Sequence, residues 1–191
     1  MRLRDDRKRA TISATAAQLF ATQPFHKVRL DDVAAAAGVG KGTLYVYFQS
    51  KEDLFFSILF DGFAGLVEQL KGELKDSKLG VWEKLTKIVE GLVSFAVQHP
   101  QLYQLMRSVA VPAEESEWEV KRKEFSDMVE RVLRDGVASG ELCDKHPEWT
   151  ALYIPSLVRA AMLFGPKQPD ARELTGHILG VLKDGICTRK S

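Results

Sequence analysis

Apolar side chains recur every three or four residues along nearly the whole of this 191-residue chain. This spacing puts them on one face of an α-helix, which has 3.6 residues per turn. No stretch of any length alternates apolar and polar residues, as a half-buried strand would. The sequence therefore predicts an all-α fold of about nine helices. They are expected at 4–22, 31–37, 41–47, 51–74, 81–97, 100–109, 114–138, 146–164 and 170–186.

Composition excludes several classes of protein. Hydrophobic residues make up 45% of the chain, enough apolar surface to offset the entropy that keeps a disordered chain unfolded. The most apolar stretch, 151–164, contains Pro155 and Arg159 and is shorter than the roughly 20 residues that a membrane span needs. Cys143 and Cys187 form neither a disulfide framework nor a metal-ligand spacing. We expect a protein of the reducing cytoplasm with no membrane partner.

Charge is distributed unevenly along the chain. Residues 1–52 hold nine Lys and Arg against five Asp and Glu, a net charge of +4, whereas the remaining residues hold 18 against 21, a net charge of −3. A basic segment joined to an acidic body favours a polyanion as the partner of the basic segment. Charge alone leaves an ordinary solvated surface as the alternative.

Residues 25–53 have the pattern of a helix-turn-helix, in which two short helices flank the turn at 38–40. Val33 and Ala36 are expected to pack the first helix. Leu44 and Phe48, four residues apart, are expected to anchor the second helix inward. The residues left to face outward or to line the edge of the core are Lys41, Gly42, Thr43, Tyr45, Val46 and Tyr47.

This outward set suits the major groove of DNA. Tyrosine and threonine hydroxyls donate to phosphate oxygens, lysine displaces counterions, and valine contacts the thymine methyl group. Each residue also has a plainer interpretation. Tyr45 and Tyr47 could sit at the edge of the core, and Lys41 and Lys51 could be solvated lysines.

The same segment resembles the DNA-binding domain of the TetR family of bacterial transcriptional regulators. The resemblance rests on Ala34 to Tyr45, which includes GVGKGTLY, followed by Tyr47-Phe48 and by SKEDL at 50–54. Residues 4–22 fit the first helix of that domain, and the rest of the chain fits only in the number and length of its helices. The resemblance implies an N-terminal three-helix DNA-binding domain over 1–50 and a C-terminal helical domain over 51–191 that binds an effector and dimerises.

The resemblance also assigns DNA contacts by position. It implies base or nearby backbone contacts for Lys41, Gly42 and Tyr45, and phosphate contacts for Thr43, Tyr47 and Lys51. Two positions depart from the family pattern. Arg29 replaces a Ser or Thr that caps the second helix, so the cap is lost and a longer-range phosphate contact is expected. Val46 occupies a variable position and can make only apolar contacts.

In the C-terminal domain the resemblance implies a cavity for a small-molecule effector, although ordinary core packing is the alternative for each candidate lining residue. Arg159 stands among apolar neighbours, so we expect it to be buried and paired with an acid, an anionic ligand or a second subunit. The candidates are Trp82, Phe95, Tyr103, Met106, Phe125, Met128, Tyr153, Arg159 and Phe164.

The last two expected helices are the candidate dimer face, because small residues allow close approach and apolar residues supply burial. A homodimer would present two recognition helices about 34–36 Å apart, or a multiple of this, to a palindromic site. The interface candidates are Leu157, Ala160, Ala161, Leu174, Ile178, Val181 and Leu182.

Together these patterns predict a regulator that binds a double-stranded DNA operator and leaves it on binding an effector, most simply a repressor. The four histidines are scattered, and the sequence has no nucleophile–base signature or phosphate loop. We therefore expect no enzyme activity, cofactor or metal. The main alternative is a helical ligand-binding or interaction protein whose head no longer binds DNA; an unrecognised enzyme is a third interpretation.

Overall fold

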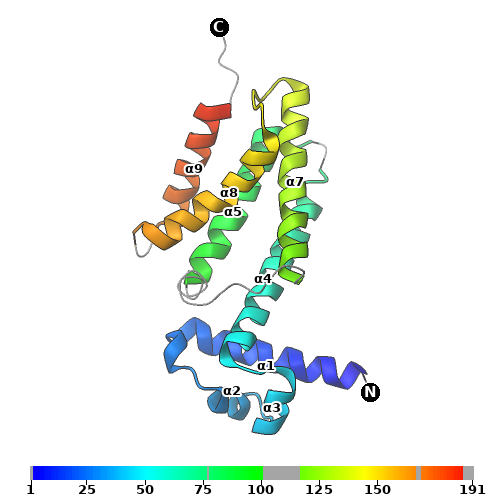
Figure 1. Cartoon of the computed structure of the whole chain (residues 1–191), viewed down its shortest axis with the longest axis vertical. Helices are drawn as coiled ribbons and strands as arrows, with labels where there is room; N and C mark the ends of the chain where they lie inside the picture. Colours follow the sequence, from blue (N-terminus) through cyan, green and yellow to red (C-terminus); the bar gives the residue numbers. More distant parts are fainter. Residues whose placement is uncertain (1, 77, 101–116, 167–168, 187–191) are drawn as a thin grey trace. The chain divides into compact units, whose positions relative to one another are not determined.

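The structure is a computed structural model that describes residues 2–76, 78–100, 117–166 and 169–186. Every element in these ranges is a helix, which confirms the all-α fold (Figure 1). Except for Pro100, the helix expected at 100–109 lies outside the described residues, as do Tyr103 and Met106. The elements are α1 (Arg2–Thr22), the 3₁₀ turn η1 (Phe25–Lys27), α2 (Leu30–Ala36), α3 (Lys41–Tyr47), α4 (Lys51–Glu73), α5 (Val81–Gln98), α7 (Glu117–Ser139), α8 (Pro147–Phe164) and α9 (Ala171–Ile186).

The chain divides into two compact units, Met1–Gly62 and Phe63–Ser191, and the division falls inside α4. Within the described residues, no helix combines the length and apolar character needed to cross a bilayer.

The N-terminal unit is built around one face of α1. Ile12, Ala16 and Phe20 lie four residues apart and are all buried. In α2 the buried residues are Val33 and Ala34. The expectation that Ala36 packs inward is wrong: Ala36 is exposed. It is the last residue of α2, just before the chain turns through Gly38 at a φ of +66°.

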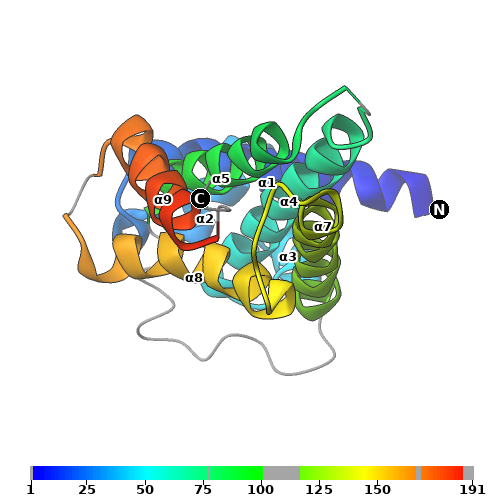
Figure 2. The ribbon, with the colours of Figure 1, turned by 90° about the horizontal axis from the view of Figure 1, so that it is seen from above.

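The C-terminal unit is a helical bundle in which α5 packs against α7, α8 and α9 (Figure 2). The buried face of α5 includes Leu85, Ile88 and Leu92. Gly91 lies on the side of α5 next to α4, and a Cβ atom there would be only 2.8 Å from Cδ1 of Leu66. The absence of a side chain at this position therefore permits the close approach of α4 and α5.

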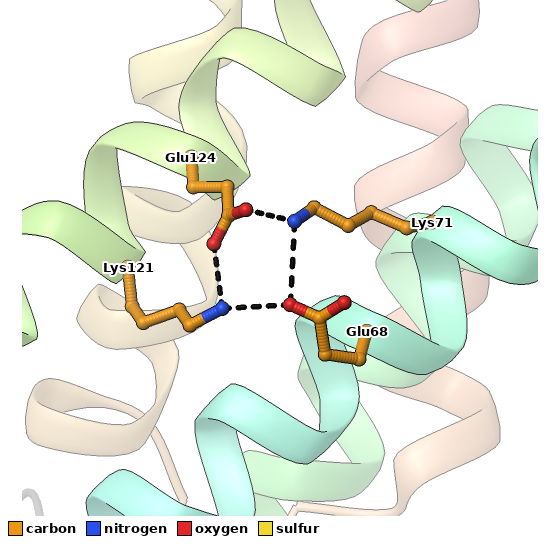
Figure 3. A network of polar contacts seen from close by, with 4 residues as sticks. All are labelled: Glu68, Lys71, Lys121 and Glu124. Atoms are coloured by element: carbon orange, nitrogen blue, oxygen red, sulfur yellow. Dashed lines mark hydrogen bonds and ion pairs between the residues drawn. The ribbon is translucent and has the colours of Figure 1, made fainter.

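Four charged side chains join α4 to α7 in a closed ring (Figure 3). Lys121 Nζ lies 2.7 Å from a carboxylate oxygen of Glu68 and 2.7 Å from one of Glu124. Lys71 closes the ring by contacting Glu124 and, at 3.3 Å, Glu68. Hydrogen bonds from Lys121 and then Lys71 lower the pKa of the Glu68 carboxyl. Each charge therefore has two neighbours of opposite sign.

We expect Leu44→Ala to destabilise the N-terminal unit by about 2–5 kcal/mol, because it leaves a cavity where a fully buried side chain packs. Val46→Ala is the matched control, since Val46 is exposed on the same helix and its loss should change stability by at most about 0.5 kcal/mol. Amide hydrogen exchange in α1 and α3 during mild denaturation measures both effects. Equal protection in the two variants would contradict this account of the core.

We expect Lys121→Gln to lower the urea midpoint of unfolding in low salt by more than Lys123→Gln does. Lys121 contacts Glu68 on α4 and Glu124 on α7 and so links two helices, whereas the ion pair of Lys123 is with Asp127 on its own helix. In 1 M NaCl the difference between the variants should fall to about half or less, because salt screens partly exposed charges. A difference that does not depend on salt would show that the ring acts by packing and not by charge.

Candidate nucleic-acid interface

The second short helix of the predicted helix-turn-helix is α3, and its bounds are those expected from the sequence. It begins after Gly40, which has an extended backbone. Leu44 lies on α3, and Phe48 is the residue that follows the end of α3. Both are buried, as their spacing of four residues predicted. The opposite side carries Tyr45, 45% exposed, and Val46, 79% exposed. Anchoring α3 by its buried side thus leaves an aromatic and an aliphatic side chain facing solvent.

Other α3 residues surround this exposed pair. Gly42 lies on the surface, and apart from its chain neighbours and the nearby backbone of α3, no atom of the described residues lies within 4 Å of the position where its Cβ would stand. Thr43 and Tyr47 are half-buried at the edges of the helix. The backbone of α3 at Gly42 is therefore open to close approach by a large partner.

Lys41 is exposed and forms an ion pair with Asp31 of α2. Its Nζ lies 2.9 Å from Asp31 Oδ1 and 3.1 Å from Oδ2. The hydrogen bond and the negative charge of Asp31 raise the pKa of Lys41 above its usual value. A partner that binds Lys41 must compete with Asp31.

Arg29 precedes α2 and has an extended backbone, with φ −108° and ψ 143°. Its side chain makes no capping hydrogen bond, in keeping with the loss of the cap that its position implied. Its carbonyl accepts the amides of Asp32 and Val33 at 3.1 and 3.2 Å. Arg29 is an exposed residue.

Lys51 has contacts that the sequence did not indicate. Its Nζ donates a 2.9 Å hydrogen bond to the Phe25 carbonyl and lies 4.4 Å from the centre of the Phe25 ring. Phe25 also packs against Phe20 and Phe55, with ring centres 5.5 and 5.2 Å apart. The lysine and the turn that it contacts are 26 residues apart, so no local pattern could reveal the pair.

Arg9 also makes contacts within the protein that the sequence did not indicate. Its guanidinium carbon lies 5.6 Å from the centre of the Phe48 ring, and its Nη2 donates to Ser57 Oγ at 2.8 Å. Arg9 therefore covers the end of α3 from α1 and also reaches α4. For Arg9 and the other basic residues near the N-terminus, the sequence allowed either a contact with the minor groove or backbone of DNA or a disordered tail.

The start of α4 was predicted correctly. The Asp53 amide donates to Ser50 Oγ at 3.0 Å, and the Gln49 amide donates to Asp53 Oδ2 at 2.9 Å. These two bonds satisfy amides that the helix itself leaves without partners. They fix where α4 begins, directly after α3.

The effector-lining candidates separate into a buried and an exposed group. Phe125 is buried and Phe95 is half-buried, and both rings pack against Phe63 with centres 5.9 Å apart. Met128 is also buried, and Trp82 is half-buried against the same core. This half of the predicted set therefore lies together in the hydrophobic core of the C-terminal unit.

The other effector-lining candidates within the described residues are exposed. Tyr153 and Phe164 lie on the outer side of α8, 56% and 81% exposed. Arg159 is exposed as well, so the expectation that it is buried is wrong. The residues of α8 that face the core are spaced three or four apart, and Arg159 falls outside their stripe.

The candidate dimer face also divides into two groups. Val181 and Ala160 are exposed, whereas Ile178 and Leu182 are buried in the core of their own chain. The last two are four residues apart and lie on the side of α9 that faces the bundle, so they do not form a surface. Leu157, Ala161 and Leu174 are half-buried at its margin.

No group of three or more His, Cys, Asp and Glu side chains in the described part of the chain could hold a metal ion.

Two family models match the chain. The model for bacterial regulatory proteins of the tetR family matches residues 12–58, which contain the helix-turn-helix. The model for the tetracyclin repressor-like C-terminal domain matches residues 78–162. Together they cover more than two thirds of the sequence and follow one another in chain order.

Known proteins agree with these matches. The chain is 26% identical over 169 residues to the HTH-type transcriptional regulator YhgD of Bacillus subtilis, which covers 85% of this chain and 86% of that protein. A transcriptional regulator of the TetR/AcrR family from Thermobifida fusca has the same fold, with a TM-score of 0.78 and 24% identity over 97% of this chain and all of that chain. The regulator FadR of Bacillus subtilis, solved in complex with stearoyl-CoA, gives a TM-score of 0.69 at 21% identity, covering 92% of this chain and 98% of that chain.

The two family models thus match the helix-turn-helix and then the helical bundle, in the order expected. The chain belongs to the TetR family of bacterial transcriptional regulators.

Proposed function

We propose that this regulator is a cytoplasmic homodimer that represses transcription from a palindromic operator and is released by a small-molecule effector. The observation that carries the proposal is the exposure of Tyr45 and Val46 on a helix whose other side is anchored by Leu44 and Phe48. A face of this kind, with a protonated lysine beside it, suits a major groove and its phosphate walls. Residues 1–50 would form the DNA-binding domain and 51–191 the effector-binding and dimerisation domain.

The proposed DNA contacts follow from where each side chain lies. Tyr45, Val46, Gly42 and Lys41 would approach base edges, with Lys41 exchanging Asp31 for DNA. Thr43 and Tyr47, at the edges of α3, would bond to phosphates, and Arg29 would reach a phosphate beyond α2. The side chain of Val46 has no hydrogen-bonding group, so it would discriminate between bases only through apolar contact, as with a thymine methyl group.

The dimer would form through the exposed side of α8 and α9. Leu152, Tyr153 and Val181 are each about half exposed and form part of an apolar surface. Gly176 and Gly180 lie on the outer side of α9, where, within the described chain and apart from α9 itself, no atom lies within 4 Å of their Cβ positions. Helices that lack side chains there can approach closely, which supports a four-helix interface between two copies.

Acyl-CoA thioesters are the first effector class to test. FadR of Bacillus subtilis, which shares the fold, binds stearoyl-CoA. The aromatic cluster around Phe63 in this chain would suit an acyl group, since apolar and aromatic side chains commonly line ligand sites. The effector would act by binding more tightly to a conformation of the dimer that does not fit the operator.

Selection of bound duplexes from a random pool, followed by footprinting, tests the proposal directly. We expect a palindromic site and a footprint whose halves lie about 34–36 Å apart or a multiple of this. Addition of an acyl-CoA series to the complex then tests release. Ligand binding without salt-dependent duplex binding would favour the alternative, a ligand-binding protein whose head no longer binds DNA.

We expect Tyr45→Ala to weaken operator binding about 10-fold or more, because a lost base or phosphate contact costs about 1–3 kcal/mol. Fluorescence anisotropy with the selected duplex measures the effect. Val120→Ala is the control, since Val120 is also a large exposed side chain but lies on α7. Wild-type affinity in Tyr45→Ala would remove Tyr45 from the interface.

We expect Val181→Glu to raise the dissociation constant of the dimer roughly 100-fold, since an unpaired carboxylate buried at an interface costs about 3 kcal/mol or more. Sedimentation over a dilution series measures it. Val120→Glu places the same charge on α7 and should leave the dimer unchanged. A monomeric wild-type chain, or equal effects of the two substitutions, would contradict the proposed interface.

A further inference from the structure

We propose that Lys51 is a positioning residue of DNA recognition: it holds the η1 turn and so orients Arg29 and α2, without itself binding phosphate. This inference rests on the proposed function, which supplies the DNA, and it departs from the phosphate contact that family resemblance implies for this lysine. The observation behind it is the pair of contacts that Lys51 makes with Phe25 in the absence of DNA.

The Lys51 ammonium is engaged on two sides by one residue. Its hydrogen bond to the Phe25 carbonyl is 2.9 Å long, and the ring of the same residue lies 4.4 Å away. A charged donor to a carbonyl makes a stronger bond than a neutral one, and a cation over an aromatic face gains further attraction. The site is partly buried, so water competes for it less than at the surface.

The turn that Lys51 contacts is already packed on its other side. The Phe25 ring meets Phe20 of α1 and Phe55 of α4, and those two rings meet each other with centres 4.9 Å apart. Two aromatic rings pack against the side chain of Phe25, and Lys51 contacts both its carbonyl and its ring. The side chain of the turn is thus held by Phe20, Phe55 and Lys51, and its backbone at Phe25 by Lys51.

Arg29 lies only four residues beyond Phe25 in the chain. Between them, Val28 is buried and Lys27 donates its amide to the Pro24 carbonyl at 2.9 Å. Little backbone freedom remains between the Phe25 carbonyl and the start of α2. Loss of the Lys51 contacts would let the backbone at Phe25 move, and the direction in which the Arg29 side chain points would therefore change.

Lys41 offers a contrast within the same domain. It pairs with Asp31 at a site where both side chains are largely exposed, so DNA can replace the carboxylate at small cost. Lys51 would instead have to give up a partly buried carbonyl and an aromatic face. The two lysines thus have different roles although both lie near the expected DNA surface.

The dependence of operator affinity on salt separates positioning from phosphate contact. Each phosphate contact contributes about 0.9 to the slope of log affinity against log salt concentration. We expect Lys51→Met, in the full chain, to lose about 10-fold in affinity with the wild-type slope. Arg29→Met, the matched control for a phosphate contact, should reduce the slope by about 0.9 per lost contact. Lys51→Arg should restore affinity to within about 3-fold, because arginine can also donate to the carbonyl and lie over the ring.

Amide hydrogen exchange without DNA tests the hold on the turn itself. We expect Lys51→Met to speed exchange about 10-fold at Lys27, Asp32 and Val33, whose amides bond to Pro24 or Arg29. Exchange in α3 and α5 should stay at the wild-type rate, which excludes general unfolding of the variant.

Two results would overturn the positioning role: a reduced salt slope in Lys51→Met, or wild-type affinity together with wild-type exchange. Faster exchange with unchanged affinity would also overturn it, while leaving the proposed function intact. If the wild-type chain binds no duplex in a salt-dependent way, the proposed function fails, and the role of Lys51 in recognition fails with it. The exchange data would still report whether Lys51 holds the turn.

Discussion

The burial of Leu44 and Phe48 is the constraint on which the rest of the N-terminal unit depends. A helix of seven residues makes only two turns, so it can bury one side and must expose the other. Once these two side chains enter the core beside Val33, Tyr45 and Val46 have no place but the surface. The outward face of α3 is therefore a consequence of core packing, and the proposed DNA contacts would use the side chains that packing leaves exposed.

Much of this arrangement follows from local sequence patterns. The bounds of α3, the turn at Gly38 and the start of α4 all depend on residues a few positions apart, and each agrees with expectation. The contact of Lys51 with Phe25 was not predictable, because it joins residues 26 positions apart. Which alanine of α2 is buried likewise depends on where the neighbouring helices pass.

In the C-terminal unit, helix ends were easier to predict than helix faces. Ile178 and Leu182 suited a dimer interface and a core equally well, since both environments select the same apolar spacing. Arg159 was expected to be buried because its sequence neighbours are apolar, yet neighbours in a helix point in different directions and its own side is exposed. The apolar content of a helix shows that one of its faces is buried. Only the tertiary structure shows whether that face packs against the core of its own chain or against another subunit.

The ring of Glu68, Lys71, Lys121 and Glu124 favours one axial register of α4 against α7. The order of charges is acid then base on α4 and base then acid on α7, so opposite signs meet in one alignment only. A shift of one helical turn, about 5.4 Å, would separate both cross-helix pairs at once. Apolar side chains alone tolerate such slippage more easily. Axial displacement of α4 would therefore cost these ion pairs together and not one at a time.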